Sequence, residues 1–508
     1  MYKLLKSDIN LKEWEFEFQQ RNKHTILMAD FWCRAFYFYM PKEIKFKIPL
    51  LDYLITSLNY GYVKKEQKKE IIEKITNACK DDKYLKYVMS QTMARVAELD
   101  ISANEVQNAL KNNNSSNKKL IDLWNKLDAT LIRVIPWFYI PWYISEYNIL
   151  TNRVNDGLNR HRKEVEPITN LSTALITLIF PTKLAAFQHE QTDFYNLVSI
   201  AQKNKQFATD KIFKQKAGSY LKKYDWITTF PLLPLPPFTY PELIDKIKQA
   251  IKTNSILDFQ KQQRAKAEND FLAQKLIKLL KNDKQLINDI EWAQELGYVL
   301  TASVENATKS AARHQGFFRK VARTLSIEEG ELGYLTSLEI LDYLKNNKSV
   351  DQKILKQRKI GYVFAIQKGI LQASFGEEAT NLALWIDELI SNVDKNVKEI
   401  KGQVANPGLA RGIVKIAPTP QDSYKLKDGE ILVCAMTGPD YVPAMKRASA
   451  IVTDEGGLLS HAAIMSREFG KPCIVGTKVA SRVLKTGDEI EVNANDGKIT
   501  ILKKAQDL

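Results

Sequence analysis

The stretch of residues 453–472 constrains the fold of this chain more than any other part of its sequence. The residues that lead into it, 450–453, are apolar and partly β-branched, which predicts a short buried strand. Two adjacent glycines follow at 456–457, and glycine lets backbone N–H groups approach a ligand closely. Ser460 is a favoured N-cap residue. The pattern therefore predicts a strand, a glycine turn and a short helix that begins at His461.

A histidine at the start of a helix lies where negative charge is stabilised. Free N–H groups and the positive end of the helix dipole favour anions. The same field lowers the imidazole pKa, which keeps the ring neutral and nucleophilic near pH 7. A nucleophilic histidine divides one phosphoryl transfer into two transfers that can occur at separate places. Local chemistry alone leaves a capping or surface histidine as the alternative.

Residues 401–503 resemble the swivelling phosphohistidine domain of the phosphoenolpyruvate-utilising enzymes. The core of that family reads T-x-x-G-G-x-x-S-H-A-A-I-x-x-R-E-x-G-x-P, and residues 453–472 match every defined position. Two flanking segments, 402–412 and 428–440, match as well. The family includes phosphoenolpyruvate synthase, pyruvate phosphate dikinase and rifampicin phosphotransferase, and the order of elements resembles the C-terminal two thirds of such enzymes. The resemblance implies that His461 is the phosphorylated residue.

The motif supplies the candidate site residues. We expect His461 to be the nucleophile, with Thr453 and Ser460 beside it. Thr453 ends a predicted strand and Thr437 lies in a strand's exit loop, so both are expected near the imidazole, with Thr453 as the orienting group. The backbone groups expected beside a phosphoryl group belong to Gly456 and Gly457.

The first 400 residues are predicted to be mainly helical, because apolar residues recur at helical spacing in long polar segments. The clearest segments are 66–79, 104–111, 241–252, 256–281, 283–299 and 301–325. Short β-rich runs appear after residue 402, at 412–417, 430–434, 450–453, 473–475, 488–492 and 498–502. The predicted fold class is multidomain: a large mainly α-helical region followed by a compact α/β swivelling phosphohistidine domain. We expect helical lobes at 1–230 and 242–395, a hinge at 396–402 and the swivelling domain at 403–508.

Composition limits the classes of function. A chain of 508 residues can form two to four domains. Its net charge of +15 is dispersed, which favours solvated helix faces over nucleic-acid binding. It contains no apolar window long enough for a membrane span and no signal core, so we expect a cytoplasmic protein without membrane contact. Four cysteines and five histidines show no metal-ligand spacing, so no metal site is predicted on this chain.

Residues 131–147 are the candidate wall of a substrate pocket. They contain Trp137, Tyr139 and Trp142, and aromatic residues at this density usually form core but also line apolar pockets. Arg313 belongs to a helix face with charges at four-residue steps. A salt-bridged face is the simpler interpretation, and a polar face turned toward a transferred phosphoryl group is the alternative.

The resemblance also implies that other parts of the reaction lie elsewhere. No glycine-rich phosphate loop followed by alternating strands is recognisable before residue 400, so an ATP-grasp domain is not expected in this chain. The sequence stops just after the swivelling domain, so the phosphoenolpyruvate-binding barrel of the dikinases is not expected in it either. We expect a separate ATP-grasp protein, using Mg²⁺ and ATP (or phosphoenolpyruvate), to load His461, and a small-molecule acceptor to bind the helical region. Pyruvate, a hydroxylated natural product and a protein remain open as acceptors. The alternative function is a non-catalytic ligand- or protein-binding module regulated by histidine phosphorylation.

Overall fold

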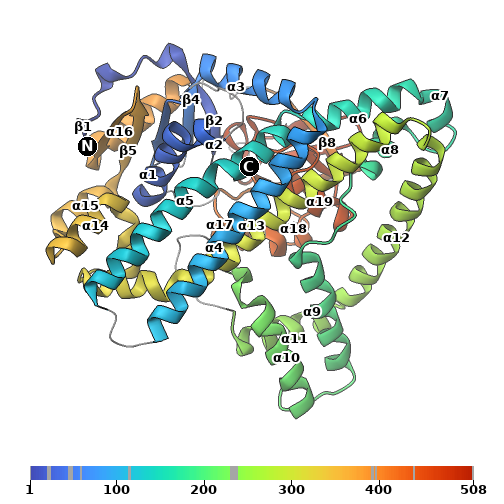
Figure 1. Ribbon diagram of the computed structural model, residues 1–508. Helices are drawn as coiled ribbons and strands as arrows, with labels where there is room; N and C mark the ends of the chain where they lie inside the picture. Colours follow the sequence, from blue (N-terminus) through green and yellow to red (C-terminus); the bar gives the residue numbers. More distant parts are fainter. Residues whose placement is uncertain are drawn as a thin grey trace.

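The computed structural model describes residues 2–19, 25–43, 50–57, 60–111, 116–228, 238–390, 394, 397–438 and 441–505 (Figure 1). A large region of packed helices precedes a C-terminal α/β domain, which confirms the predicted fold class. The asparagine-rich loop expected at 112–117 and the proline cluster at 231–241 lie largely outside the described residues. None of the helices in the described ranges has the length and apolar character that a bilayer crossing needs.

Three long helices form the centre of the helical region: α4 (Asp82–Lys111), α5 (Asn117–Glu146) and α13 (Lys284–Thr324). The sequence analysis predicted two helices, at 283–299 and 301–325. The structure has one helix, α13, because the apolar face continues through residue 300. Helix α5 also continues through Pro136 and Pro141. A proline at position 141 cannot donate to the carbonyl of Trp137. The Thr92 hydroxyl lies 3.2 Å from that carbonyl oxygen and supplies a donor from α4.

Shorter helices surround this centre. They are α1 (Ile26–Arg34), α2 (Met40–Glu43), α3 (Lys65–Ala78), α6 (Ile149–Arg160), α7 (Arg162–Val165), α8 (Leu171–Leu178), α12 (Ser255–Leu280), α14 (Ser337–Asn346), α15 (Gln352–Ile360) and α16 (Gly376–Ile390).

A six-stranded sheet that the sequence did not predict lies within the helical region. Its order is β1-β6-β5-β3-β4-β2. The strands are β1 (Tyr2–Lys3), β2 (Trp14–Gln19), β3 (Tyr53–Thr56), β4 (Tyr60–Lys64), β5 (Tyr362–Gln367) and β6 (Ile370–Phe375). Strands β5 and β6 form a hairpin whose turn residues, Lys368 and Gly369, both have positive φ. Helices α1 and α16 both pack against β5.

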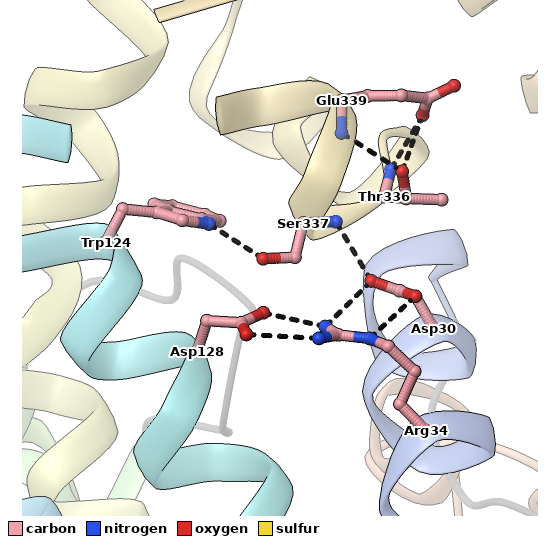
Figure 2. Close-up of polar contacts among 7 residues, drawn as sticks. All are labelled: Asp30, Arg34, Trp124, Asp128, Thr336, Ser337 and Glu339. Atoms are coloured by element: carbon pink, nitrogen blue, oxygen red, sulfur yellow. Dashed lines mark hydrogen bonds and ion pairs between the residues drawn. The ribbon is translucent and has the colours of Figure 1, made fainter. Parts of the chain in front are cut away.

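A buried polar network ties α1, α5 and α14 together (Figure 2). The Arg34 guanidinium donates to the carboxylates of Asp30 and Asp128, so each acid lies beside a compensating charge. The first turn of α14 joins the network because the Ser337 N–H donates to Asp30. The sequence Thr336–Glu339 is a capping box: the Thr336 hydroxyl accepts from the Glu339 N–H, and the Glu339 carboxylate accepts from the Thr336 N–H.

Helices α9 (Ala186–Gln202), α10 (Lys211–Tyr224) and α11 (Tyr240–Lys252) form an arm that projects from the rest of the chain (Figure 1). The arm has a core of its own, which includes Val198, Phe213, Tyr224 and Ile247. Residues on both sides of the predicted 230–242 division therefore share one core. The division itself falls largely on residues outside the described ranges, 229–237, and stays a prediction.

The C-terminal domain is built on an eight-stranded sheet of order β7-β14-β13-β9-β10-β11-β12-β8. The strands are β7 (Glu399–Lys401), β8 (Gln403–Asn406), β9 (Leu409–Ile416), β10 (Ile431–Cys434), β11 (Ala450–Thr453), β12 (Cys473–Val475), β13 (Glu489–Asn493) and β14 (Lys498–Lys503). Strands β9 to β12 are parallel, and all six predicted β runs are strands. The helices of this domain are α17 (Pro420–Ser423), α18 (Val442–Arg447), α19 (His461–Glu468) and α20 (Ala480–Val483). Strand β7 lies inside the predicted hinge, and the hinge stays a prediction.

Candidate functional site

The predicted helix start is present. Helix α19 begins at His461, and the Ser460 hydroxyl caps it by accepting from the Ala463 N–H at 3.4 Å. The imidazole is held from one side: its Nδ1 lies 2.9 Å from the Thr437 hydroxyl oxygen. Thr437 follows β10, at the carboxyl end of the parallel strands, where ligand sites in open α/β sheets lie. His461 is therefore a half-buried histidine at a helix N-terminus with a fixed partner on its ring.

The structure places Thr437, rather than Thr453, at the imidazole. The Thr453 side chain is buried, and its hydroxyl donates to the Glu455 carbonyl at 2.7 Å. Thr453 thus stabilises the turn before the glycine pair. The sequence could not distinguish the two threonines, because each ends or follows a predicted strand. The path of the loop after β10 is what brings Thr437 to the imidazole.

The glycine pair is pressed against helix α5. Gly456 has a φ of +105°, and a Cβ there would lie 2.8 Å from the Ser460 side chain. A Cβ at Gly457 would overlap the carbonyl oxygen of Ser145. The N–H of Gly456 donates to the Glu146 carboxylate at 2.7 Å. In this arrangement the expected phosphate-binding backbone therefore contacts the C-terminal end of α5.

A cavity of about 350 Å³ lies between the helical region and His461. One face of α5 forms a wall of it, at the helical repeat Leu127, Leu131, Ile135, Phe138, Trp142 and Ser145. The C-terminal domain supplies the loop residues Met436, Thr437, Gly438, Glu455, Gly456 and Ser460 and the first two residues of α19, His461 and Ala462. Helices α1, α4 and α13 supply most of the remaining lining, which is mainly apolar and aromatic. Among the described residues that line the cavity, none is a lysine or an arginine.

Two of the four predicted pocket residues line this cavity. Tyr139 and Trp142 do so, and burial raises the pKa of the Tyr139 phenol. Trp137 does not line it: its side chain is in the core and packs edge-on against Tyr87. Arg313 lies outside the lining as well, and its guanidinium is 3.4 Å from the Asp100 carboxylate. The simpler interpretation of Arg313, an ion-paired helix face, fits this contact.

His314 is a polar lining group that the sequence did not indicate. Its Nδ1 lies 2.8 Å from the Ser310 carbonyl oxygen, and its Nε2 lies 3.2 Å from the Ser102 hydroxyl. Because a carbonyl oxygen only accepts, Nδ1 carries the proton. Burial lowers the pKa of His314, so the ring is neutral at pH 7. The cavity thus presents a neutral polar group on α13 rather than a cation.

The carboxylates near His461 are buried. Glu146, the last residue of α5, and Glu455, which precedes the glycine pair, both line the cavity. Within the described ranges, no group of three or more acidic, histidine or cysteine side chains is arranged to hold a metal ion. The described residues therefore offer an imidazole, a largely apolar cavity whose described lining has no lysine or arginine, and two acidic groups.

The fold and the site together indicate a class of protein domain. A parallel sheet that presents a threonine-held histidine at a helix start, after a glycine pair, fits a domain that carries a group on the ring. Comparison with protein families agrees: residues 426–497 match the family described as PEP-utilising enzyme, mobile domain. The C-terminal part of this chain is therefore similar to the mobile domain of the PEP-utilising enzymes.

Individual relatives match different shares of the chain. The probable phosphoenolpyruvate synthase of Pyrococcus horikoshii is 39% identical over 178 residues, which is 35% of this chain. That of Archaeoglobus fulgidus is 55% identical over 98 residues, or 19% of this chain. An uncharacterized phosphotransferase of Bacillus subtilis, YvkC, is 25% identical over 384 residues, or 71% of this chain. The matched segments span 22%, 13% and 43% of these three relatives, respectively.

Proposed function

We propose that this chain is a phosphotransferase component that carries a phosphoryl group on His461 to a small-molecule acceptor bound by the helical region. The observation that supports the proposal best is the cavity. A histidine at a helix N-terminus borders a cavity whose other walls come mainly from α1, α4, α5 and α13. The relatives are named phosphoenolpyruvate synthases and a phosphotransferase, which is consistent with this chemistry.

The contact with Thr437 determines which ring nitrogen of His461 acts as the nucleophile. If Nδ1–H donates to the Thr437 hydroxyl, the lone pair is on Nε2. In the loading step Nε2 attacks the terminal phosphorus of ATP, the P–N bond forms, the P–O bond to ADP breaks and ADP leaves. A separate ATP-grasp chain would hold ATP and Mg²⁺ for this step. Phosphoenolpyruvate would serve as an alternative donor, with pyruvate as the leaving group.

The second step unloads His461. An acceptor hydroxyl oxygen attacks the phosphorus, the P–N bond breaks, and Nε2 regains its lone pair while the hydroxyl proton passes to solvent. The lining favours one acceptor class among those left open by the sequence. A carboxylate such as pyruvate needs a cation when it is buried, and the described lining contains no lysine or arginine. A neutral, largely apolar molecule with a hydroxyl group fits these walls.

A labelling experiment tests the loading step. We expect γ-³²P-ATP plus the ATP-grasp partner to label the wild type and not His461→Ala. His189→Ala is the matched control, since His189 is an exposed histidine on α9, and it should label like the wild type. Equal labelling of His461→Ala would overturn the proposal.

A cavity-filling variant tests the acceptor. Ala307 lines the cavity, so Ala307→Phe should leave loading intact and slow the acceptor-dependent loss of label by about tenfold or more, since close packing leaves no room for both groups. The measurement compares label loss upon addition of a hydroxylated aromatic compound and upon addition of pyruvate. Loss with pyruvate alone would refute the neutral acceptor, and loss with neither compound would support the regulated binding module instead.

A further inference from the structure

A single carboxylate of the helical region binds two groups of the C-terminal domain, which we call the mobile domain (residues 403–508). Glu146 is the last residue of α5, and its side chain is buried. One carboxylate oxygen accepts from the Gly456 N–H at 2.7 Å, and the other forms an ion pair with Lys478. Moving the mobile domain away from α5 breaks both interactions.

This contact is adjacent to the phosphorylatable ring. Gly456 lies close to Ser460, because a Cβ added at Gly456, whose φ is +105°, would come within 2.8 Å of the Ser460 side chain. Ser460 precedes His461 and caps its helix. Glu146 and His461 also line the same cavity. The carboxylate is thus linked to the ring through one tight turn.

The part of α5 that faces this turn is negative. Glu146 lines the cavity, and the C-terminal end of α5 contributes its own partial negative charge. Glu455 and the N-terminus of α19 belong to the mobile domain and move with His461, so they do not change the force between the two parts. A phosphoryl group on histidine adds a charge of about −2. Lys478 is the cation that the structure pairs with Glu146, and its side chain is 61% exposed, so it lies at the rim.

We propose that Glu146 is a latch that holds the mobile domain on α5 while His461 is unmodified, and that phosphorylation of His461 weakens the latch by charge repulsion. The proposal rests on the proposed function in one respect, namely that His461 accepts a phosphoryl group. The unloaded domain then rests over the cavity, and the loaded domain is held there less tightly. Transfer to an acceptor in the cavity takes place in the docked fraction, removes the charge from His461 and restores the full strength of the latch.

Two other contacts between the two parts lie away from the glycine turn. The Gln188 side chain donates to Glu468 at 2.7 Å, and the Lys446 ammonium lies 5.7 Å from the centre of the Tyr195 ring. Neither pair includes a residue of the glycine turn. Glu468 also belongs to the mobile domain, so it moves with His461. Glu468→Gln is therefore a matched control for a change at Glu146.

The test loads His461 without any protein donor. Phosphoramidate transfers its phosphoryl group to imidazole: the P–N bond of the reagent breaks, a P–N bond to histidine forms and ammonia leaves. Hydrogen–deuterium exchange, followed by mass spectrometry on peptides that cover residues 141–148 and 455–461, reports the opening of the latch. In the wild type we expect phosphorylation to raise the opening equilibrium roughly tenfold, a change of about 1.4 kcal/mol. His461→Ala should show no change, which controls for reaction at other histidines.

Two variants at the latch should change this response in opposite directions. Glu146→Gln keeps an acceptor for the Gly456 N–H and loses the charge, so the response to phosphorylation should fall to about twofold or less. Lys478→Met removes the compensating cation at an exposed position, so the response should grow. If Glu146 and Lys478 only stabilised the docked state, both variants would change the response to phosphorylation in the same direction. An unchanged response in Glu146→Gln, or none in the wild type, would overturn the latch, whereas failure of ATP-dependent labelling would count only against the loading step.

Discussion

At the scale of single residues, the chemistry of the site depends on which ring nitrogen of His461 is free to attack. The Thr437 hydroxyl lies 2.9 Å from Nδ1, and a hydrogen bond at that nitrogen selects the tautomer. The hydroxyl of Thr453 is committed to the Glu455 carbonyl. The two threonines of the motif region therefore have separable tasks: one orients the ring and the other shapes the turn.

We predict that Thr437→Val slows chemical phosphorylation of His461 at pH 7 by about 10- to 100-fold, because the ring loses the partner that fixes its tautomer. Thr437→Ser retains the hydroxyl and should react at close to the wild-type rate. The measurement is the initial rate of labelling by phosphoramidate, with His461→Ala as the background. A rate for Thr437→Val within twofold of the wild type would show that the hydroxyl does not set the nucleophile.

At the scale of secondary-structure elements, local signals were sufficient in the C-terminal domain. The N-cap Ser460, the glycine pair and the β-branched runs predicted α19 and six strands, because each is specified by neighbouring residues. The six-stranded sheet was not predictable in this way. It pairs β3 with β5, whose residues are more than 300 positions apart, so no local pattern records the contact.

The residues that line the cavity were also only partly predictable from the sequence. The aromatic density of α5 indicated a wall, and Tyr139 and Trp142 lie on it. Sequence alone could not give the rotation of the helix, so it could not separate these residues from Trp137. Glu146 does not belong to any motif that the sequence analysis recognised. Its role depends on a contact with Gly456, 310 positions away, and on burial that only the fold reveals.

The contact between the glycine turn and α5 gives a prediction about elements. Gly457→Ala should displace the turn from α5, because the added Cβ would overlap the Ser145 carbonyl oxygen. We expect a cost of about 1–3 kcal/mol to the docked state, seen as faster hydrogen exchange of residues 141–148. Gly218→Ala is the control: this exposed glycine of α10 has open space around it, and alanine there should stabilise the helix by about 1 kcal/mol or less. Equal exchange in Gly457→Ala and the wild type would contradict the close approach.

At the scale of the whole molecule, one buried acid couples the projecting arm to the central helices. Glu305 of α13 accepts from the N–H groups of Ala186 and Phe187, at 2.7 and 2.8 Å, and so caps the start of α9. Burial raises the pKa of Glu305 from 4.5 to about 7. The capping carboxylate of α11 behaves in the opposite way, since hydrogen bonds from Thr239 lower the pKa of the exposed Glu242.

These opposite shifts give opposite dependences of stability on pH. Between pH 4.5 and about 7 the folded chain holds a proton on Glu305 that the unfolded chain has released, so this group's contribution to stability falls as the pH rises through that window. The full change is on the order of 3 kcal/mol. Glu305→Gln should therefore flatten the decline of the urea midpoint between pH 5 and pH 7. Glu242→Gln should instead remove a small contribution that is present above the acid's unfolded pKa and is lost as the pH falls. A decline of the same slope in Glu305→Gln and the wild type would show that Glu305 is ionised throughout, and that its two N–H donors outweigh its burial.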